Sequence, residues 1–314
     1  MRTAIVGAVS STKILLHSLI NGGIKPLRLF TLPRDMHHRH SDFVDLTLDC
    51  SEHDVEVSYI SDINDPETIN ELKQLNLDIL FVVGWSQICR SNVLNIPSQG
   101  CIGYHPALLP LYRGRAVIPW TILLDLSETG GTFFFLDEGV DSGDIIIQES
   151  FLVEPNETAT TLYKKHEIAL GKMSNALVKI LTKGKIPRKQ QDHSLATYCA
   201  KRVANDGLIN WQLPAQEIWR LIRAVTDPYP GAFSFWKNEK LIIWNATPVD
   251  ASRYIGLPGQ VQDICDEGVI VQCGDQQHLL LREVQIEGQD RINPKYIFKK
   301  HERLGIDVIN ILKR

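Results

Sequence analysis

An apolar run at Asp78–Gly84 (DILFVVG) limits the fold of this chain more than any other feature. A strand that is apolar at nearly every position is buried on both faces, and such strands occur in parallel sheets covered by helices on both sides. Similar apolar runs at 3–7, 27–32 and 55–60 alternate with segments of helical character. This alternation is typical of a doubly wound sheet. The sequence therefore predicts an α/β fold with a mostly parallel sheet.

The first predicted turn, Gly7 to Ser11 (GAVSS), argues against one common use of such a sheet. It lacks the second and third glycines of the G-x-G-x-x-G motif, which let a dinucleotide approach the backbone. We therefore predict no nicotinamide cofactor.

A histidine stands at the end of a later predicted strand. Residues Cys101 to His105 are predicted to form this strand, and Pro106 and Pro110 prevent regular pairing beyond it. In open parallel sheets, ligands bind at the carboxyl ends of the strands. An imidazole with an ordinary pKa of about 6.5 can accept or donate a proton there at neutral pH.

An acidic turn (DEGVDSGD) follows the next predicted strand, Gly131 to Leu136. A carboxylate beside a histidine holds the tautomer of the ring and raises its basicity, so the two strand ends could form an acid/base pair. The residue types do not choose among Asp137, Asp141 and Asp144. A strand-end histidine beside a solvated loop is the alternative.

A long helix and a basic segment separate two predicted domains. Residues 158–181 have apolar side chains at helical spacing, and we expect His166 on this helix to be a surface or interface residue. Irregular basic residues follow at 183–205. Because 314 residues exceed the usual limit of a single core, we predict a catalytic domain at 1–184, a linker at 185–206 and a second domain at 207–314.

The second domain is predicted to be mainly β. An amphipathic helix is expected at 214–225 and a short terminal helix at 292–305. Turn residues separate strand candidates at intervals of roughly eight to twelve positions, which is typical of a small barrel. These candidates lie at 232–237, 241–246, 259–263, 268–273 and 278–286.

Charge and cysteine content argue against several classes of protein. The formal charge of -4 and pI near 6.2 do not favour a broad nucleic-acid-binding surface. The six cysteines contain no C-x-x-C pair, so we predict reduced thiols in a cytoplasmic protein. His37, His38 and His40 share their loop with two arginines, and we predict no metal site there. No signal peptide or membrane-spanning run is expected.

Two runs around the histidine and the acidic turn resemble the folate-dependent N-formyltransferase family. They are HPALLPLYRGRAVIPW (105–120) and ETGGTFFFLDEGVDSGDIIIQ (128–148). The resemblance extends over nearly the whole chain, so it is more specific than a single motif. Members of this family move a formyl group from N10-formyltetrahydrofolate to a primary amine. The resemblance implies that His105 and Asp141 are the catalytic residues.

The same resemblance implies the binding residues. The formyl donor is expected at the turn after the apolar strand and at the leucine loop after the histidine. The arginines of that loop are expected to meet a phosphate or carboxylate of the acceptor, although the first of them could instead fix its own loop. The implied cofactor contacts are Trp85, Ala107, Leu108, Leu109, Pro110 and Val140, the implied substrate contacts are Arg113, Arg115 and Tyr104, and no metal is implied.

One position departs from the family pattern. The family usually reads Asn-x-His, and the asparagine falls on Gly103. Residues 103 and 105 share one face of a strand whereas Tyr104 points to the other, so Tyr104 cannot replace the amide. Loss of one donor of this kind costs about 2–4 kcal/mol in comparable sites. A non-catalytic ligand-binding homologue is therefore an alternative to an enzyme.

The second domain is similar to the C-terminal barrel, of oligonucleotide-binding type, in methionyl-tRNA and amino-sugar formyltransferases. The similarity depends on INW (209–211), PYPGAF (228–233) and LIIWNATPV (241–249). The loop at 33–46 is shorter and less basic than the loop with which methionyl-tRNA formyltransferases usually meet the acceptor stem. We therefore expect a nucleotide-linked 4-amino sugar as the substrate, as in O-antigen synthesis, with methionyl-tRNA as the alternative. Homodimer formation remains open.

Overall fold

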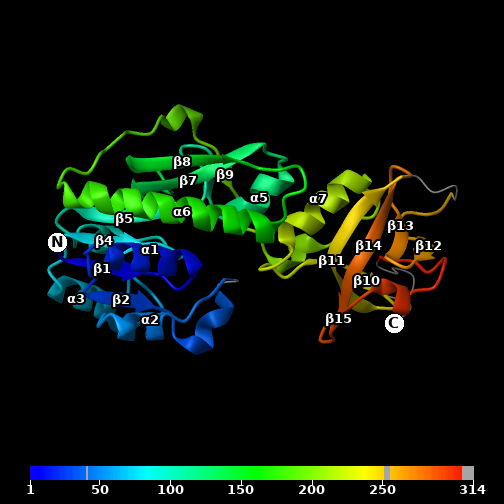
Figure 1. Ribbon diagram of the computed structural model, residues 1–314, viewed down its shortest axis with the longest axis horizontal. Coiled ribbons are helices and arrows are strands. Elements are labelled where there is room, and N and C mark those ends of the chain that lie inside the picture. Colours follow the sequence, from blue (N-terminus) through cyan, green and yellow to red (C-terminus); the bar gives the residue numbers. More distant parts are fainter. Residues whose placement is uncertain (40–41, 251–254, 306–314) are drawn as a thin grey trace. The chain divides into compact units, whose positions relative to one another are not determined.

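The computed structural model describes residues 1–39, 42–250 and 255–305 (Figure 1). His40 of the histidine loop and the last nine residues lie outside these ranges. The chain divides into two units. The first comprises residues 1–117, 127–153 and 163–201, and the second comprises 118–126, 154–162 and the residues from 202 onward.

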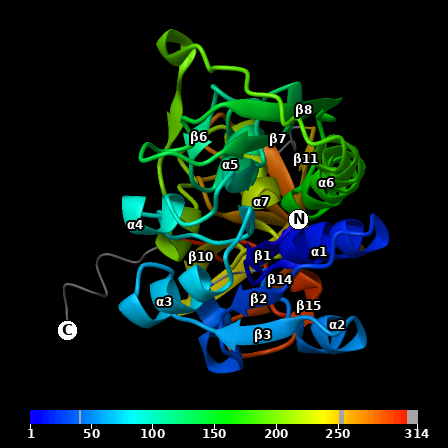
Figure 2. The ribbon, with the colours of Figure 1, turned by 90° about the vertical axis from the view of Figure 1, so that its left-hand side faces the viewer.

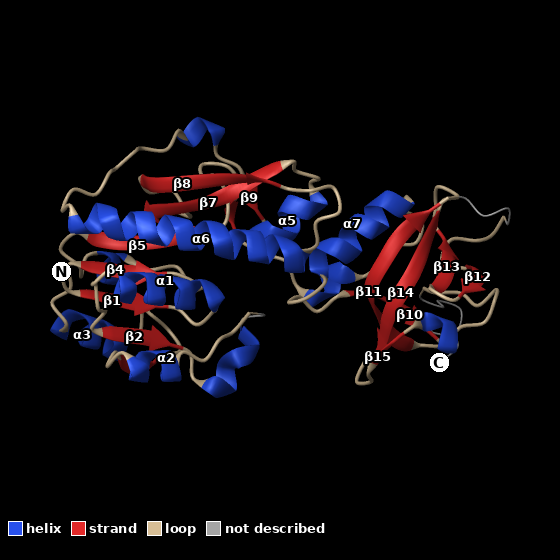
Figure 3. Ribbon diagram, viewed as in Figure 1, coloured by secondary structure: helices blue, strands red, loops and turns tan. Residues whose placement is uncertain are grey.

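A seven-stranded sheet forms the centre of the first unit (Figure 3). Its strands are β1 (Thr3–Val6), β2 (Arg28–Thr31), β3 (Glu56–Tyr59), β4 (Ile79–Val82), β5 (Gly100–His105), β7 (Glu128–Phe135) and β8 (Ile145–Leu152). They lie in the order β3-β2-β1-β4-β5-β7-β8. The first five are parallel, whereas β7 runs antiparallel to β5 and β8 runs antiparallel to β7. The predicted α/β fold with a mostly parallel sheet is confirmed.

Helices lie on both faces of this sheet (Figure 2). They are α1 (Ser10–Asn21), α2 (Thr47–Glu52), α3 (Pro66–Gln74), α4 (Ser91–Leu94) and α6 (Ala159–Thr182), with the 3-10 helix η1 (Arg34–Arg39). Helices α1 and α6 cover one face, and α3 and α4 cover the other (Figure 2). Among the described residues, no helix combines the length and apolarity needed to cross a membrane.

The apolar side chains of β4 pack into two hydrophobic cores, one on each face of the sheet. Ile79 and Phe81 pack in the cluster of α1 and α6, whereas Leu80 and Val82 pack in the cluster of α3 and α4. All four side chains are buried. Successive strand residues point to opposite faces, so a central strand covered on both sides needs an apolar residue at every position.

The second unit contains a six-stranded antiparallel sheet (Figure 3). Its elements are α7 (Ala215–Val225), β10 (Ala232–Trp236), β11 (Glu239–Val249), β12 (Val261–Cys265), β13 (Gly268–Gln272), β14 (His278–Ile286) and β15 (Arg291–Ile292). The strands lie in the order β10-β11-β14-β13-β12, and β15 pairs with β14. The helix and the five longer strands confirm the elements predicted at 214–286. Residues 118–126 of this unit include most of α5 (Val117–Leu123).

The prediction of a terminal helix at 292–305 is wrong. Within this range, only Pro294–Tyr296 forms a helical turn, the 3-10 helix η4. The backbone N–H of His301 donates to the carbonyl of Val261, and the N–H of Val261 donates to the carbonyl of Glu302. Since these backbone groups bond to a strand, they cannot form the local ladder of an α-helix.

The segment predicted as a linker, 185–206, is divided between the units at residue 201. Lys189 and Ile145 exchange two backbone hydrogen bonds of 2.8 and 2.9 Å. Further along, β9 (Tyr198–Cys199) pairs with β6 (Arg113–Gly114). Residues 189–199 therefore contact the loops around the predicted active site.

Candidate active site

His105 and Asp141 lie together in the first unit. Nδ1 of His105 is 3.5 Å from Oδ2 of Asp141, and the two side chains are 6% and 21% exposed. Asp144 instead lies 3.8 Å from Arg188, and Asp137 accepts hydrogen bonds within its own turn. Of the three aspartates that the residue types left open, Asp141 is the one beside the histidine.

A returning loop, not a shared edge of the sheet, brings Asp141 to His105. Because β7 is antiparallel to β5, its carboxyl end lies beside Cys101, where the N–H of Leu136 donates to the Cys101 carbonyl at 2.8 Å. Four residue-to-residue steps along the strand, about 13 Å, separate Cys101 from His105. The chain after Leu136 must therefore return along β5. The expectation that two strand ends meet at one edge is corrected accordingly.

Gly103 provides space for this return. A Cβ atom at position 103 would lie 2.7 Å from Cδ2 of Leu136 and 3.3 Å from Cε1 of Phe134. The Leu136 side chain thus occupies the place into which a side chain at 103 would project. The departure from Asn-x-His is therefore coupled to the packing of the loop that carries Asp141.

We expect Gly103→Asn to destabilise the chain by roughly 1–3 kcal/mol, because the new side chain overpacks against Leu136. The double variant Gly103→Asn with Leu136→Ala should recover part of this loss, since the shorter side chain vacates the space. Urea unfolding of both variants measures the effect. A single variant as stable as the wild type would contradict the packing argument.

The loop after β5 holds both members of the pair. Nε2 of His105 lies 2.7 Å from the carbonyl oxygen of Tyr112, and a carbonyl only accepts, so Nε2 is the donor. The N–H of Gly114 donates to Oδ2 of Asp141 at 2.7 Å. Nδ1 of the ring is then the atom that faces the carboxylate. Among the described residues, none donates a hydrogen bond to Oδ1 of Asp141.

Three residues in and beside the pair have strained backbone conformations. Tyr112, Ala116 and Asp141 have φ angles of 57°, 57° and 50°. A non-glycine residue in this left-handed region costs about 1–3 kcal/mol and persists only where its surroundings hold it. Such strain is typical of functional sites.

Polar side chains of β7 and β8 hold the leucine loop. Oγ1 of Thr132 donates to the carbonyl of Ala107 at 2.6 Å, and Nε2 of Gln148 donates to the carbonyl of Leu109 at 2.7 Å. Ala107 and Leu109 are buried. The half-buried members of the loop are Leu108 and Pro110.

The residues present fit a folate as the formyl donor. Ile88, Leu111 and Val140 are 62%, 38% and 42% exposed, and they lie in the segments that follow β4, β5 and β7. Trp85 and Leu136 are partly buried against the same core cluster. A flat pterin ring needs apolar side chains with a few polar groups beside them, and these segments offer both.

The two arginines of the loop differ in accessibility. Arg113 is 2% exposed, and its guanidinium donates to Oε1 of Gln191, to Nδ1 of His193 and to the hydroxyl of Tyr198. This position favours the alternative that Arg113 fixes its own loop. The exposed Arg115 remains the accessible cation.

Tyr104 lies on the opposite face of the sheet from His105. Its ring centroid is 5.4 Å from that of Phe133. Its hydroxyl is buried without a hydrogen-bond partner among the described residues, and burial raises the pKa of Tyr104 above its usual range. The structure therefore does not bring Tyr104 to the pair.

His166 is buried, contrary to the predicted surface or interface position. It is 4% exposed, and its ring meets the edge of Phe151 with the centroids 4.9 Å apart. It lies four residues after Leu162 and four before Leu170, so it shares the buried face of α6. Burial, with a smaller contribution from the charge of His105, lowers the pKa of His166 to about 3.

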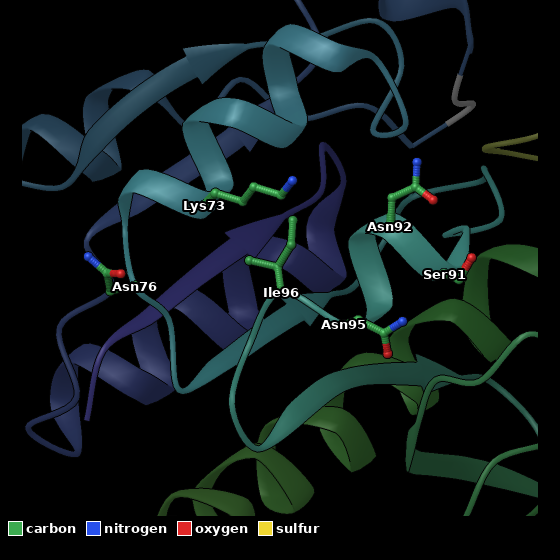
Figure 4. A pocket seen from close by; sticks show the side chains of 6 residues that line it. All are labelled: Lys73, Asn76, Ser91, Asn92, Asn95 and Ile96. Carbon is green, nitrogen blue, oxygen red and sulfur yellow. The ribbon is translucent and has the colours of Figure 1, made fainter.

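A polar cavity of about 460 Å³ lies away from the pair, between the end of α3 and α4 (Figure 4). These segments lead into the amino ends of β4 and β5, whereas His105 lies at the carboxyl end of β5. The cavity is lined by Lys73, Asn76, Ser91, Asn92, Asn95 and Ile96. In the described ranges, no group of three or more His, Cys, Asp or Glu side chains could hold a metal ion.

Sequence reasoning missed three residues that organise the site: Thr132, Gln148 and Gln191. Gln191 lies in the predicted linker, yet its side-chain amide contacts the loop of Asp141. Amide and hydroxyl side chains occur throughout a sequence and carry no pattern of their own. Only the folded contacts identify them.

Known proteins resemble this chain in both sequence and fold. Family models match residues 35–177 ("Formyl transferase") and residues 202–302 ("Formyl transferase, C-terminal domain"). Methionyl-tRNA formyltransferase of Geobacter sulfurreducens is 32% identical over 77% of this chain and 74% of its own length. The enzyme of the same name from Syntrophus aciditrophicus is 34% identical over 76% of both chains.

Among solved structures, the N-formyltransferase of Helicobacter canadensis, in complex with folinic acid and dTDP-3-aminofucose, is similar in fold. It has a TM-score of 0.66 and 19% identity, and covers 90% of this chain and 99% of its own. The relatives above 30% identity, which share about three quarters of both chains, carry the assignment. The chain belongs to the formyl transferase family.

Proposed function

We propose that this chain transfers a formyl group from N10-formyltetrahydrofolate to the amino group of a nucleotide-linked amino sugar. The observation that carries the proposal is the contact between His105 and Asp141, whose Oδ1 accepts no hydrogen bond from any described residue. An amine must lose a proton when it attacks a formyl carbon, so a carboxylate that can accept it is the required group.

When bound, N10-formyltetrahydrofolate supplies a formyl carbon open to attack by an amine. Oδ1 of Asp141 accepts the proton that the amine loses as its nitrogen bonds to the formyl carbon, and gives this proton to N10 as the bond between that carbon and N10 breaks, so tetrahydrofolate is the leaving group. Nδ1 of His105, 3.5 Å from Oδ2, holds the carboxylate in place. The carbonyl of Tyr112 keeps the ring oriented through Nε2. The side chains proposed to hold the donor are Trp85, Leu108, Pro110 and Val140, with Ala107 and Leu109 as the buried support of the loop.

The charge of the second unit supports a small acceptor. Residues 202–314 contain fourteen Lys or Arg and fourteen Asp or Glu residues, so this part of the chain has no net positive charge. Binding of a tRNA backbone depends on lysine and arginine side chains that neutralise phosphates. Arg115 is the accessible cation proposed to meet a phosphate of the nucleotide.

Methionyl-tRNA is the second candidate acceptor. It is supported by the relatives that are 32% and 34% identical, which carry the name methionyl-tRNA formyltransferase. His105 and Asp141 would act in the same way on the amine of either acceptor. The acceptors differ in the part of the molecule that the rest of the protein would bind.

A formyl-transfer assay distinguishes these candidates. The chain is incubated with N10-formyltetrahydrofolate and either a panel of nucleotide-linked 3- and 4-amino sugars or methionyl-tRNA, and tetrahydrofolate release is followed by absorbance. We expect release with one amino sugar, whose product carries a formyl group in place of one amine hydrogen, as its mass would show. Release with methionyl-tRNA alone would establish the second candidate. Binding of the folate without release in either case would favour a non-catalytic homologue.

A further inference from the structure

We propose that Gln191 is a positioning residue for formyl transfer, which sets the place of Asp141 by bonding its loop to the loop that holds His105. This inference rests on the proposed function, because it assigns a role in the same reaction. It concerns a residue of the segment predicted to be a linker.

The Gln191 side chain joins two loops through both ends of its amide. Nε2 donates to the carbonyl of Asp141 at 2.9 Å and to the carbonyl of Gly143 at 2.7 Å. Oε1 accepts from Nε and Nη2 of Arg113 at 3.2 and 2.6 Å. The residue is 4% exposed, so these hydrogen bonds are shielded from water.

Arg113 lies between the two residues that hold the catalytic pair. The carbonyl of Tyr112 accepts from His105, and the N–H of Gly114 donates to Oδ2 of Asp141. These hydrogen bonds form a closed network. The Gln191 amide bonds to the Asp141 backbone, the Asp141 carboxylate bonds to the N–H of Gly114, and Arg113, the neighbour of Gly114, bonds back to Gln191. A shift of either loop changes the distance between the imidazole and the carboxylate.

The conformation of Asp141 requires such a support. Its φ of 50° lies in the left-handed region, which aspartate adopts at a cost. The carbonyl bonded by Gln191 belongs to this same residue. The two backbone hydrogen bonds between Lys189 and Ile145 hold the segment close to the end of the loop.

Only an amide satisfies both sides of this contact. Two backbone carbonyls need N–H donors, and a guanidinium needs an acceptor oxygen. Glutamate would keep the acceptor for Arg113 and lose both donors. Methionine would lose the acceptor as well. The two substitutions therefore separate the support of Asp141 from the anchoring of Arg113.

The test compares the full chain with Gln191→Glu, Gln191→Met and the control Gln190→Met. Gln190 is the exposed neighbour of the same type. We expect both variants at 191 to lower kcat by about tenfold to a hundredfold, the loss expected when a reacting group is misplaced by about 1 Å. KM for the folate should change less than twofold, because the apolar donor-binding segments are not altered. The control should keep the kcat of the wild type.

A wild-type kcat in Gln191→Glu would overturn the proposal, because the lost donors would then be irrelevant. The proposal would also be overturned if both variants lowered kcat and folding stability to the same extent as each other and raised KM. That result would indicate a purely structural role.

Hydrogen exchange separates failure of this inference from failure of the proposed function. If the wild type transfers no formyl group to any acceptor, the proposed function fails, yet exchange at the amides of residues 139–143 still tests the contact. We expect faster exchange there in Gln191→Met than in Gln190→Met. Unchanged exchange would show that Gln191 does not hold the loop of Asp141.

Discussion

Asp141→Asn is expected to lower kcat for formyl transfer by about a hundredfold to ten-thousandfold, the contribution of a positioned acid/base group. The amide cannot accept the proton that the attacking amine loses. It keeps the fold, because its side-chain oxygen can still accept from the N–H of Gly114 and asparagine tolerates the positive φ of this position. Steady-state kinetics with the acceptor found by the transfer assay measures the effect.

Asp144→Asn is the matched control, since Asp144 lies in the same turn and pairs with Arg188 instead of His105. We expect it to keep most of the wild-type rate. The double variant His105→Ala with Asp141→Asn should lose little more than either single variant, because residues that act as a unit are not additive. Equal impairment of the Asp141 and Asp144 variants would remove the specific role of Asp141.

His166 is expected to make the chain less stable as the pH falls. The folded state keeps this ring neutral, with a pKa lowered from 6.5 to about 3 by burial and then by the charge of His105. Between these values the unfolded state binds more protons, so the free energy of unfolding falls as the pH falls through this window. For a single group the slope approaches about 1.4 kcal/mol per pH unit.

His166→Leu should flatten this dependence, because leucine cannot bind a proton. Denaturant unfolding of both proteins at pH 7, 6 and 5 measures it, and we expect the wild type to lose about 2 kcal/mol more than the variant between pH 7 and 5. His37→Leu is the control, since His37 is exposed. Parallel curves for the wild type and His166→Leu would show that the buried ring does not cause the acid sensitivity.

Local sequence patterns predicted the elements of this fold better than they predicted contacts between distant residues. The run at 78–84 predicted a strand covered on both faces, and its side chains alternate between two cores. The local pattern was misleading at 292–305, where hydrogen bonds to Val261 prevent a helix. It was also misleading at His166, a titratable side chain that is buried on the packing face of α6. In each failure a contact distant in sequence outweighed a local preference.

The sequence by itself determined the mostly parallel sheet and the family, because apolar periodicity and motif order are properties of neighbouring residues. Only the tertiary structure decided that Asp141 reaches His105 by returning along β5, since strand direction depends on pairing. It also decided that the polar segment around Gln191 contacts the loops that carry Asp141 and Arg113. An amide side chain acquires such a role only from the groups it meets after folding, and those groups lie about 50 and 78 positions away in the chain.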